Sequence, residues 1–405
     1  MSERLIIIGN GMAAVRFVEE LAKRSLGRHA IAVIGEEPRL AYNRVLLSAL
    51  LAEEIECSDI ELRPPHWWRD RGVTLRYGAR ATSVDPIARA VTLSDGTRLA
   101  FSKLVFATGS QPIRPEMPGM DLPGVHTFRN IDDVNAIAAV KGTGARVVVI
   151  GGGLLGLEAA YGLAKAGCEV SVLHLMDRLM ERQLDQMAAS MLRRAIEAKG
   201  ITLHLNAETS RIAGSGRVEA VELKDGSTIP AGAVVVAVGI RPSTELARGA
   251  GLAINRGIIV DDNLETGISG IHAIGECAEH RGVCYGLVEP AHEQARLLAR
   301  RFSGEDARYP GSVPATNLKV SGVDVFSAGD FLGATAGADE IVLSDPGLGV
   351  YKKLVIAHDQ LIGAVLFGDT SDGLSYLDLI RSGASIEHLR DQLVFGCEPT
   401  ARIAA

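Results

Sequence analysis

Two stretches of this chain are near copies of one another, LIIIGNGMAA at Leu5–Ala14 and VVVIGGGLLG at Val147–Gly156. In each copy, four apolar residues run without polar alternation into a group of glycines, which is typical of a strand covered on both faces of a parallel sheet. The residues that follow, Ala13–Lys23 and Leu154–Lys165, have the apolar spacing of a helix. Each copy therefore predicts a strand, a glycine turn and a helix.

The repeat continues beyond the glycines. IAVIGEEPRL from Ile31 matches VSVLHLMDRL from Val170, and LVFATGSQP from Leu104 matches VVVAVGIRP from Val234. Because three segments recur in the same order, the sequence predicts one fold used twice. The expected class is α/β with two Rossmann-like dinucleotide-binding domains.

Each residue of the glycine pattern has its own task. The first position allows a tight turn, the second lets a pyrophosphate approach the backbone, and the third lets helix and strand pack closely. These positions are Gly9, Gly11 and Ala14 in the first copy and Gly151, Gly153 and Gly156 in the second. The helix N-terminus then offers N–H groups to the phosphates. Two bound dinucleotides are expected.

The copies differ where an acid ordinarily holds the ribose 2′-hydroxyl at the end of the second strand. Glu36 stands there in the first copy and His174 in the second. A neutral imidazole could bond ribose hydroxyls, whereas a protonated one with Arg178 or Arg182 nearby could accept a 2′-phosphate. The sequence leaves both readings open, with NADH slightly favoured over NADPH.

Composition excludes several classes of protein. The 405 residues include 45 glycines, carry a net charge of −7 and contain 4% aromatic residues, so a nucleic-acid binder is not expected. The five cysteines are scattered and form no CxxC pair, which argues against a zinc ribbon or a thioredoxin-like dithiol. No signal peptide or membrane span is recognisable, so we expect a cytoplasmic protein with no membrane partner.

The order of the motifs GNGMAA, FATGS, GGGLLGLE, AVGIRP and TGISGIHAIGECA resembles that of the two-dinucleotide-binding flavoprotein reductases. The resemblance implies FAD in the first site and NAD(P)H in an inserted second domain. The FAD-site residues that it implies are Gly9, Gly11, Met12, Ala13, Ala14, Glu36, Arg44, Ala107, Thr108, Gly109, Gly275, Glu276, Val288 and Pro290. Those for the nicotinamide dinucleotide are Gly151, Gly153, Leu154, Leu155, Gly156, Glu158, His174 and Gly239. The family usually has Asp where Glu276 stands.

Within that superfamily, the thiol-dependent subgroup carries cysteine in the segment that corresponds to Leu40–Leu51, and this chain has none there. The Arg44 region is similar to that of the rubredoxin and ferredoxin reductases, whose motif is usually RPPLSK. This chain reads RVLLSA, so the expected lysine is replaced by Ala49.

Three further segments, HLMDRLMERQLD, GECAEHRGVCYGLVEPA and the closing VFGCEP, are most similar to the FAD module of assimilatory nitrite reductases. They also resemble the electron-transfer subunit of assimilatory nitrate reductases. Because no iron–sulfur or sirohaem segment precedes Ala405, we expect that the chain does not reduce nitrite alone.

The function implied is a reductase that takes hydride from NAD(P)H onto FAD and passes electrons to an external metal-centred protein. That acceptor would be an assimilatory nitrate or nitrite reductase, or a rubredoxin- or ferredoxin-like protein. Glu158 is expected on the first turn of the second helix, where it would position the nicotinamide or stabilise the helix N-terminus. The alternatives are a flavin-containing interaction or redox-sensing protein, and an NADH oxidase.

Two other groups allow more than one reading. Cys277, His280 and Cys284 could ligate a metal, but a loop over the cofactor is favoured and no metal site is predicted. The pair Trp67 and Trp68 could dock a partner, and packing against the sheet is favoured. The oligomeric state is left open.

The expected FAD domain is discontinuous, covering residues 1–114 and 245–310, with the NAD(P)H domain at 115–244 between its parts. Residues 311–405 resemble the C-terminal interface domain of the family, a smaller α+β domain. There, YKKLVIAH and QLIGAVLFG predict two strands joined at Asp359-Gln360, and a helix is expected at Leu374–Ser382.

Overall fold

The computed structural model describes residues 3–25, 27–140, 144–320 and 322–396. The chain divides into two compact units. The first comprises Met1–Leu47, Ile55–Gln111 and Ile240–Ser312, and the second comprises Ser48–Glu54, Pro112–Gly239 and Val313–Ala405. The three domains expected from the sequence are a finer division, and their boundaries stay a prediction.

The first unit is built on a five-stranded parallel sheet in the order β19-β7-β1-β2-β3. Its strands are β1 (Glu3–Ile8), β2 (His29–Gly35), β3 (Thr74–Tyr77), β7 (Lys103–Phe106) and β19 (Ile271–Ala273). The central strand β1 pairs with β2 on one side and β7 on the other, and its apolar residues from Leu5 to Ile8 are all buried. This burial explains why the sequence shows an uninterrupted apolar run.

Smaller elements surround this sheet. An antiparallel sheet comprises β4 (Ala81–Asp85), β5 (Ala90–Leu93) and β6 (Arg98–Ala100), and a parallel pair comprises β18 (Ile258–Val260) and β20 (Ala278–His280). The short helices are η1 (Arg44–Leu46), η2 (Cys57–Ile60), α3 (Pro65–Arg69), α7 (Glu245–Gly249) and η3 (Gly275–Cys277). The chain crosses between the units at the paired strands β8 (Ser110–Pro112) and β17 (Ile240–Pro242).

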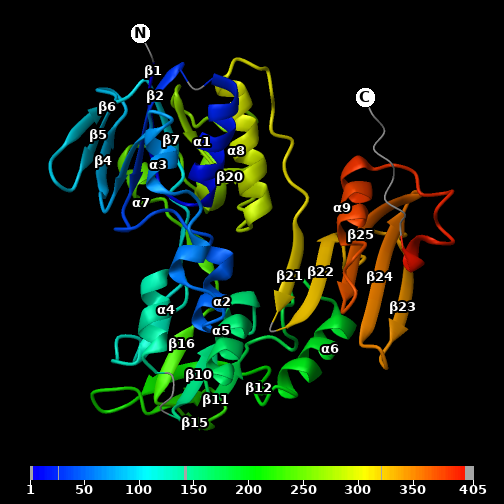
Figure 1. The fold of residues 1–405 in the computed structure, drawn as a ribbon. Coiled ribbons are helices and arrows are strands. Elements are labelled where there is room, and N and C mark those ends of the chain that lie inside the picture. The colour runs from blue at the N-terminus through cyan, green and yellow to red at the C-terminus, as the bar shows by residue number, and fades with distance from the viewer. Residues whose placement is uncertain (1–2, 26, 141–143, 321, 397–405) are drawn as a thin grey trace. The chain divides into compact units, whose positions relative to one another are not determined.

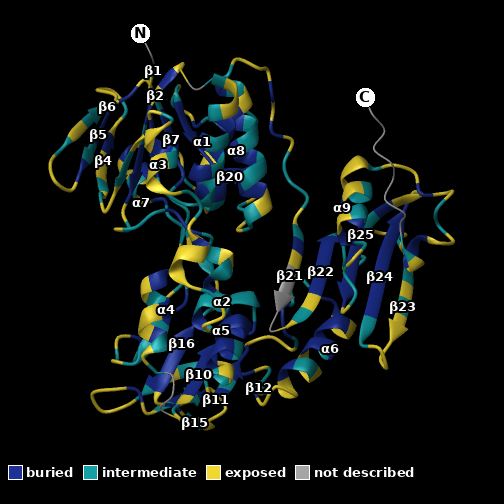
Figure 2. Ribbon diagram, viewed as in Figure 1, coloured by how far each residue is buried: buried dark blue, intermediate teal, exposed yellow. Residues whose placement is uncertain are grey.

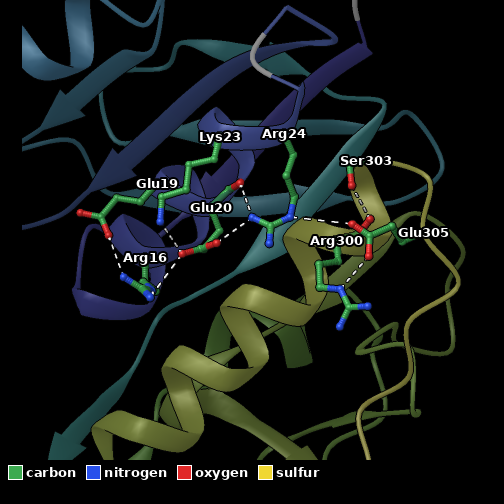
Figure 3. A network of polar contacts seen from close by, with 8 residues as sticks. All are labelled: Arg16, Glu19, Glu20, Lys23, Arg24, Arg300, Ser303 and Glu305. Atoms are coloured by element: carbon green, nitrogen blue, oxygen red, sulfur yellow. Dashed lines mark hydrogen bonds and ion pairs between the residues drawn. The ribbon is translucent and has the colours of Figure 1, made fainter. Parts of the chain in front are cut away.

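Helices α1 (Met12–Ser25) and α8 (Val288–Phe302) lie side by side in the first unit (Figure 1). Phe17 and Phe302 meet edge to face, with ring centroids 5.5 Å apart. Beside them, the buried carboxylate of Glu20 bonds Arg24 at 2.7 Å and Lys23 at 2.9 Å (Figure 3). Since α1 begins at the first glycine turn, this packing fixes the direction of the turn.

The second unit contains a matching parallel sheet in the order β12-β11-β10-β16-β9. Its strands are β9 (Val125–Thr127), β10 (Arg146–Ile150), β11 (Glu169–Leu173), β12 (Thr202–His204) and β16 (Ala233–Val236). Its helices are α2 (Leu47–Leu51), α4 (Ile131–Ala138), α5 (Leu154–Lys165) and α6 (Gln186–Glu197). Here β10 lies between β11 and β16, as β1 lies between β2 and β7, so the sequence repeat is a structural repeat.

The remaining strands of this unit are antiparallel. One sheet has β13 (Thr209–Ala213), β14 (Ala220–Leu223) and β15 (Thr228–Pro230). The other, in the order β21-β22-β25-β24-β23, has β21 (Ala315–Val320), β22 (Val323–Gly329), β23 (Asp339–Asp345), β24 (Val350–Ala357) and β25 (Gln360–Phe367). Helix α9 (Gly373–Ser382) and the short η4 (Leu393–Phe395) complete this region.

The hairpin between β24 and β25 differs by one residue from the expectation. Its turn is formed by His358 and Asp359, at φ +51° and +55°, and Gln360 already belongs to β25. Successive positive φ values are those of a two-residue turn that matches the strand twist. The expected turn at Asp359-Gln360 is therefore wrong by one position.

Buried residues concentrate in the strands of each sheet and on the sheet-facing sides of the helices (Figure 2). Trp68 of α3 is 1% exposed within the core of the first unit, which confirms the packing prediction for that residue. Among the residues that the structure describes, no helix combines the length and apolarity needed to cross a bilayer. The mixed α/β architecture with two Rossmann-like sheets is the predicted fold class.

Candidate functional site

The first glycine of each turn lies where no other residue fits. Gly9 has φ +115° and Gly151 has φ +122°. A Cβ on Gly9 would lie 2.0 Å from the carbonyl oxygen of Ala107, and one on Gly151 would lie 2.3 Å from that of Ala237. The first turn thus passes against the end of β7 and the second against the end of β16, and this close approach requires glycine at both positions.

The second glycine of each turn leaves open space instead. A Cβ on Gly11 or Gly153 would meet nothing within 4 Å. Gly153 is the N-cap of α5, and no side chain caps its helix. Two open backbone cradles at helix N-termini are therefore present, and their geometry fits the pyrophosphate of a dinucleotide.

The third position differs between the copies. A Cβ on Gly156 would lie 1.9 Å from the carbonyl oxygen of Gly151, so only glycine fits. The first copy accommodates the methyl group of Ala14, which is fully buried. The half-buried Met12 and Ala13, and Leu154 and Leu155 in the second copy, form the first turns of α1 and α5 beside the cradles.

Gly275 brings the end of β19 to the start of α1. It has φ +79°, and a Cβ there would lie 3.1 Å from the Cβ of Ala13. Its N–H donates to Oε1 of the buried Gln294, at 2.7 Å. Gln294 lies on α8, whose first turn contains Val288 and Pro290. The sequence analysis missed Gln294, because an amide on an amphipathic helix carries no motif.

Glu276 lies beside the segment that follows β7. The hydroxyl of Ser110 donates to its Oε2 at 2.7 Å, and a Cβ on Gly109 would come within 3.8 Å of the same oxygen. The hydroxyl of Thr108 donates to the carbonyl oxygen of Ser243 at 2.8 Å. The residues Ala107–Gly109 and Gly275–Glu276 are thus assembled at the carboxyl end of one sheet.

The two remaining residues predicted for the first site are Glu36 and Arg44. Glu36 follows β2, and its side chain is 71% exposed, with Arg80 Nε 3.6 Å from its Oε1. Arg44 donates to the hydroxyl of Tyr42 at 2.9 Å and to the carboxylate of Glu37. Tyr42 in turn donates to Glu37 at 2.7 Å. Glu37 and Tyr42 hold Arg44 and were not singled out from the sequence.

In the second unit, Glu158 is buried on α5 beside Ser48 of α2. It is the fifth residue of a helix that begins at Leu154, so the expected position on the first turn is wrong. Burial raises the pKa of Glu158 to about 7, against an opposing hydrogen bond from Ser48. The next residue after Ser48 is Ala49, where the reductase motif has lysine.

His174 has partners for both ring nitrogens. The N–H of Gly152 donates to Nδ1 at 3.0 Å, and Nε2 lies 3.1 Å from Oε2 of Glu181. The ring is buried against the turn, since a Cβ on Gly152 would lie 2.7 Å from its Cγ. At the end of β16, Gly239 has φ +121°, and its carbonyl oxygen accepts from the N–H of Ile113 at 2.9 Å.

The Cys277, His280 and Cys284 group is not arranged as a metal site. The thiol of Cys277 is fully buried and bonds the carbonyl oxygens of Phe106 and Ile274, whereas His280 Nε2 bonds Asp262 at 2.8 Å. Within the described ranges, no cluster of His, Cys, Asp and Glu could hold a metal ion. Of the closing motif, Val394–Gly396 are described, whereas Cys397, Glu398 and Pro399 lie outside the described residues.

Two family models match the chain in sequence. Residues 3–295 match the pyridine nucleotide-disulphide oxidoreductase model, and residues 314–384 match the C-terminal domain of rubredoxin NAD+ reductase. The chain belongs to the pyridine nucleotide-disulphide oxidoreductase family. Members of this family are FAD- and NAD(P)H-dependent reductases, which confirms the predicted enzyme class and cofactors.

Curated relatives of this family member include a nitrite reductase and an electron transfer subunit of a nitrate reductase. The chain is 44% identical to a nitrite reductase [NAD(P)H] of Bacillus subtilis, over 95% of this chain and 48% of the relative. It is 40% identical to the assimilatory nitrate reductase electron transfer subunit of the same organism, over 97% and 51%. The chain therefore spans about half the length of these relatives.

Solved structures agree with the family assignment. A ferredoxin reductase from Rhodopseudomonas palustris is 29% identical, with a TM-score of 0.85 over 97% of this chain and 100% of that one. The NADH:rubredoxin oxidoreductase from Clostridium acetobutylicum is 26% identical, with a TM-score of 0.79 over 98% and 99%. The resemblance inferred from the sequence motifs is confirmed.

Proposed function

We propose that this family member transfers hydride from NAD(P)H to bound FAD and delivers the electrons to a separate metal-centred protein. The observation that carries the proposal is the pair of equivalent cradles, one in each unit, at Gly11 and Gly153. One cradle would hold FAD and the other the nicotinamide coenzyme. When bound, FAD supplies the chemistry that converts a two-electron hydride transfer from NAD(P)H into single-electron steps.

In this scheme, the residues of the first unit bind and orient FAD. The open backbone at Gly11 and the N-terminus of α1 bind the pyrophosphate, and the exposed carboxylate of Glu36 accepts from the ribose of the FAD adenosine. Arg44 is held in place by Glu37 and Tyr42 and provides a fixed positive charge. The segments containing Gly109 and Glu276 close the same end of the sheet.

The second unit holds the coenzyme. Gly153 and the N-terminus of α5 bind its pyrophosphate, and Gly151 and Gly156 allow the turn to pack. Glu158 is assigned as a residue that positions the nicotinamide. Its burial on the second turn of α5 argues against the alternative role of stabilising the helix N-terminus, because dipole effects fade beyond the first turn.

The acceptor is proposed to be an external protein. The segment Leu40–Leu51 has no cysteine, and the buried thiol of Cys277 has its pKa raised by burial, so neither provides a redox thiol. Two relatives, an electron transfer subunit of nitrate reductase and an NADH:rubredoxin oxidoreductase, point to a nitrate or nitrite reductase component or a small iron protein.

Two further expectations become part of the proposal. The functional domains are taken as residues 1–114 with 245–310 for FAD, 115–244 for NAD(P)H and 311–405 for the partner interface. Action in the cytoplasm is supported by the four described cysteines, which are all free thiols and suit a reducing compartment.

Anaerobic stopped-flow spectroscopy of the purified yellow protein tests the function. We expect rapid bleaching of the flavin absorbance by NADH or NADPH, followed by rapid reoxidation on adding ferricyanide. A protein that binds no flavin, or a flavin that neither coenzyme reduces, would contradict the proposal. Slow reoxidation by every acceptor would favour a sensing role instead.

A further inference from the structure

In the second dinucleotide site, a carboxylate contacts the residue that stands where the strand-end acid is expected. His174 is the first residue after β11, and its Nδ1 accepts from the N–H of Gly152 in the glycine turn. An imidazole that accepts at Nδ1 carries its proton on Nε2, and this nitrogen donates to Glu181. The carboxylate of Glu181 is therefore held one imidazole ring away from the glycine turn.

The end of the second strand has a defined task in the dinucleotide fold. The acid at the end of the second strand accepts a hydrogen bond from the ribose 2′-hydroxyl of the coenzyme. Glu181 lies seven positions after His174, outside the strand, which is why the sequence pattern does not reveal it. Its side chain is 24% exposed, so the carboxylate remains accessible although it is anchored.

We propose, resting on the function proposed above, that Glu181 selects the coenzyme and that the coenzyme is NADH. The carboxylate accepts from the ribose 2′-hydroxyl and repels the 2′-phosphate of NADPH. His174 is a positioning residue, which orients Glu181 and binds the turn but does not itself recognise the ribose.

The neighbouring charges support this assignment. Arg178 and Arg182 were the candidates for binding a 2′-phosphate. Arg178 lies 3.2 Å from the carboxylate of Asp177, and Arg182 lies 3.9 Å from Glu181 itself. A 2′-phosphate would therefore have to displace two carboxylates from their cations, whereas a hydroxyl donates to Glu181 without disturbing either pair.

The segment that follows His174 also offers an apolar surface. Leu175 and Met176 follow His174 directly and are exposed. Exposed apolar side chains beside a ribose-binding carboxylate suit the flat face of an adenine ring. The same short segment thus provides both the polar and the apolar contacts of an adenosine.

Calorimetric titration of the flavin-loaded protein with ADP-ribose and with 2′-phospho-ADP-ribose tests the assignment without any redox step. We expect the wild-type protein to bind ADP-ribose at least about 10-fold more tightly, the size of one charge-assisted hydrogen bond. Glu181→Gln should weaken ADP-ribose binding by about 10-fold and reduce the discrimination between the two ligands to within about 3-fold. Stopped-flow reduction by NADH and NADPH should show the same loss of preference.

Glu169→Gln is the matched control, because Glu169 lies at the opposite end of the same strand β11 and is exposed. It should leave both affinities unchanged. His174→Asn should weaken ADP-ribose binding as Glu181→Gln does, and the two substitutions together should cost no more than either one, because they act through one contact.

Three results would overturn the assignment. If the wild-type protein preferred the 2′-phosphorylated ligand, Arg178 and Arg182 would bind the 2′-phosphate in spite of Glu181. An unchanged ligand ratio in Glu181→Gln would remove Glu181 from the ribose site while leaving the reductase function intact. If neither ligand binds and neither coenzyme reduces the flavin, the proposed function fails and this inference fails with it.

Discussion

The hydroxyl of Tyr351 donates a 2.6 Å hydrogen bond to Oδ2 of Asp185. Asp185 is the N-cap of α6, where its other oxygen accepts from the N–H of Ala188 at 3.0 Å. Tyr351 and Lys353, two residues apart on β24, both approach this carboxylate, with Lys353 Nζ at 3.9 Å. One buried carboxylate thus caps a helix of the second Rossmann-like sheet and joins it to the C-terminal sheet.

Removing the Tyr351 hydroxyl should destabilise the second unit. In Tyr351→Phe, Asp185 keeps its helix cap but loses a buried hydrogen bond to a charged acceptor, worth about 2 kcal/mol. We expect a lower melting temperature in differential scanning calorimetry, with flavin content unchanged. Tyr77→Phe is the control, since Tyr77 is exposed and its substitution should leave the melting temperature unaltered. Equal melting temperatures for both variants would show that the bond contributes nothing.

Glu158 should make stability depend on pH. Burial raises its folded-state pKa to about 7, from an ordinary value of 4.5. The folded protein therefore holds this proton more tightly than the unfolded chain, so stability falls as pH rises from about 4.5 to about 7 and stays lowered above that. Glu158→Gln cannot ionise and should lack this decline, which amounts to at most about 3 kcal/mol.

Denaturant unfolding of wild type and Glu158→Gln across this pH range measures the effect as a difference between the two proteins. Ser48→Ala should move the decline to higher pH, because the Ser48 hydrogen bond lowers the pKa of Glu158. Glu197→Gln, on the exposed face of α6, should reproduce the wild-type profile. A Glu158→Gln profile parallel to that of the wild type would mean that the pKa of Glu158 is the same in the folded and the unfolded chain.

Gly11 and Gly153 allow the two cradles to be tested separately. An alanine at either position meets no atom within 4 Å, so both variants should fold. Each added methyl group fills the space that a pyrophosphate needs. Gly11→Ala should lower the flavin content of the purified protein, whereas Gly153→Ala should keep its flavin and weaken NADH binding by about 10-fold or more. Absorbance at the flavin band and stopped-flow reduction measure the two effects.

Each of these variants is the control for the other. Loss of flavin in Gly153→Ala would reverse the assignment of the two sites. By contrast, Gly9→Ala should prevent correct folding of the first unit, because its Cβ would lie 2.0 Å from the carbonyl oxygen of Ala107. This difference between neighbouring glycines separates a steric requirement of the fold from a requirement of the ligand.

The fold could be predicted largely because its signal is local. The apolar runs that begin at Leu5 and Val147 are buried on both faces, and each ends in a glycine whose conformation other residues rarely adopt. The repeat can therefore be recognised from the amino-acid sequence alone. The turn at His358-Asp359 was misplaced by one residue, since Asp359 is a turn former in either register and neither His358 nor Gln360 shows on which side of it the second turn residue lies.

The candidate site was less completely predictable. Gly275, which lies within a motif, was found, but its partner Gln294 was not, because a tertiary hydrogen bond leaves no spacing in the sequence. His174 was noticed as a departure from the pattern, and its engagement with Gly152 and Glu181 could not be inferred from a helix or strand period. Conversely, the position of Glu158 on α5 depended on where the helix begins, which sequence patterns fix least well.

Electron transfer should not need a cysteine. Cys277 is fully buried and Cys284 is half-buried, and burial raises the pKa of the Cys284 thiol to about 11, so neither forms a reactive thiolate near neutral pH. Cys57 is exposed. We therefore expect Cys57→Ser to reduce ferricyanide with NADH at the wild-type rate. Peptide mapping after iodoacetamide treatment at pH 8 should show modification of Cys57 and protection of Cys277 and Cys284. A Cys57→Ser enzyme that stops after one reduction of its flavin would mean that electrons leave through a thiol, and the direct transfer to a metal-centred acceptor would have to be abandoned.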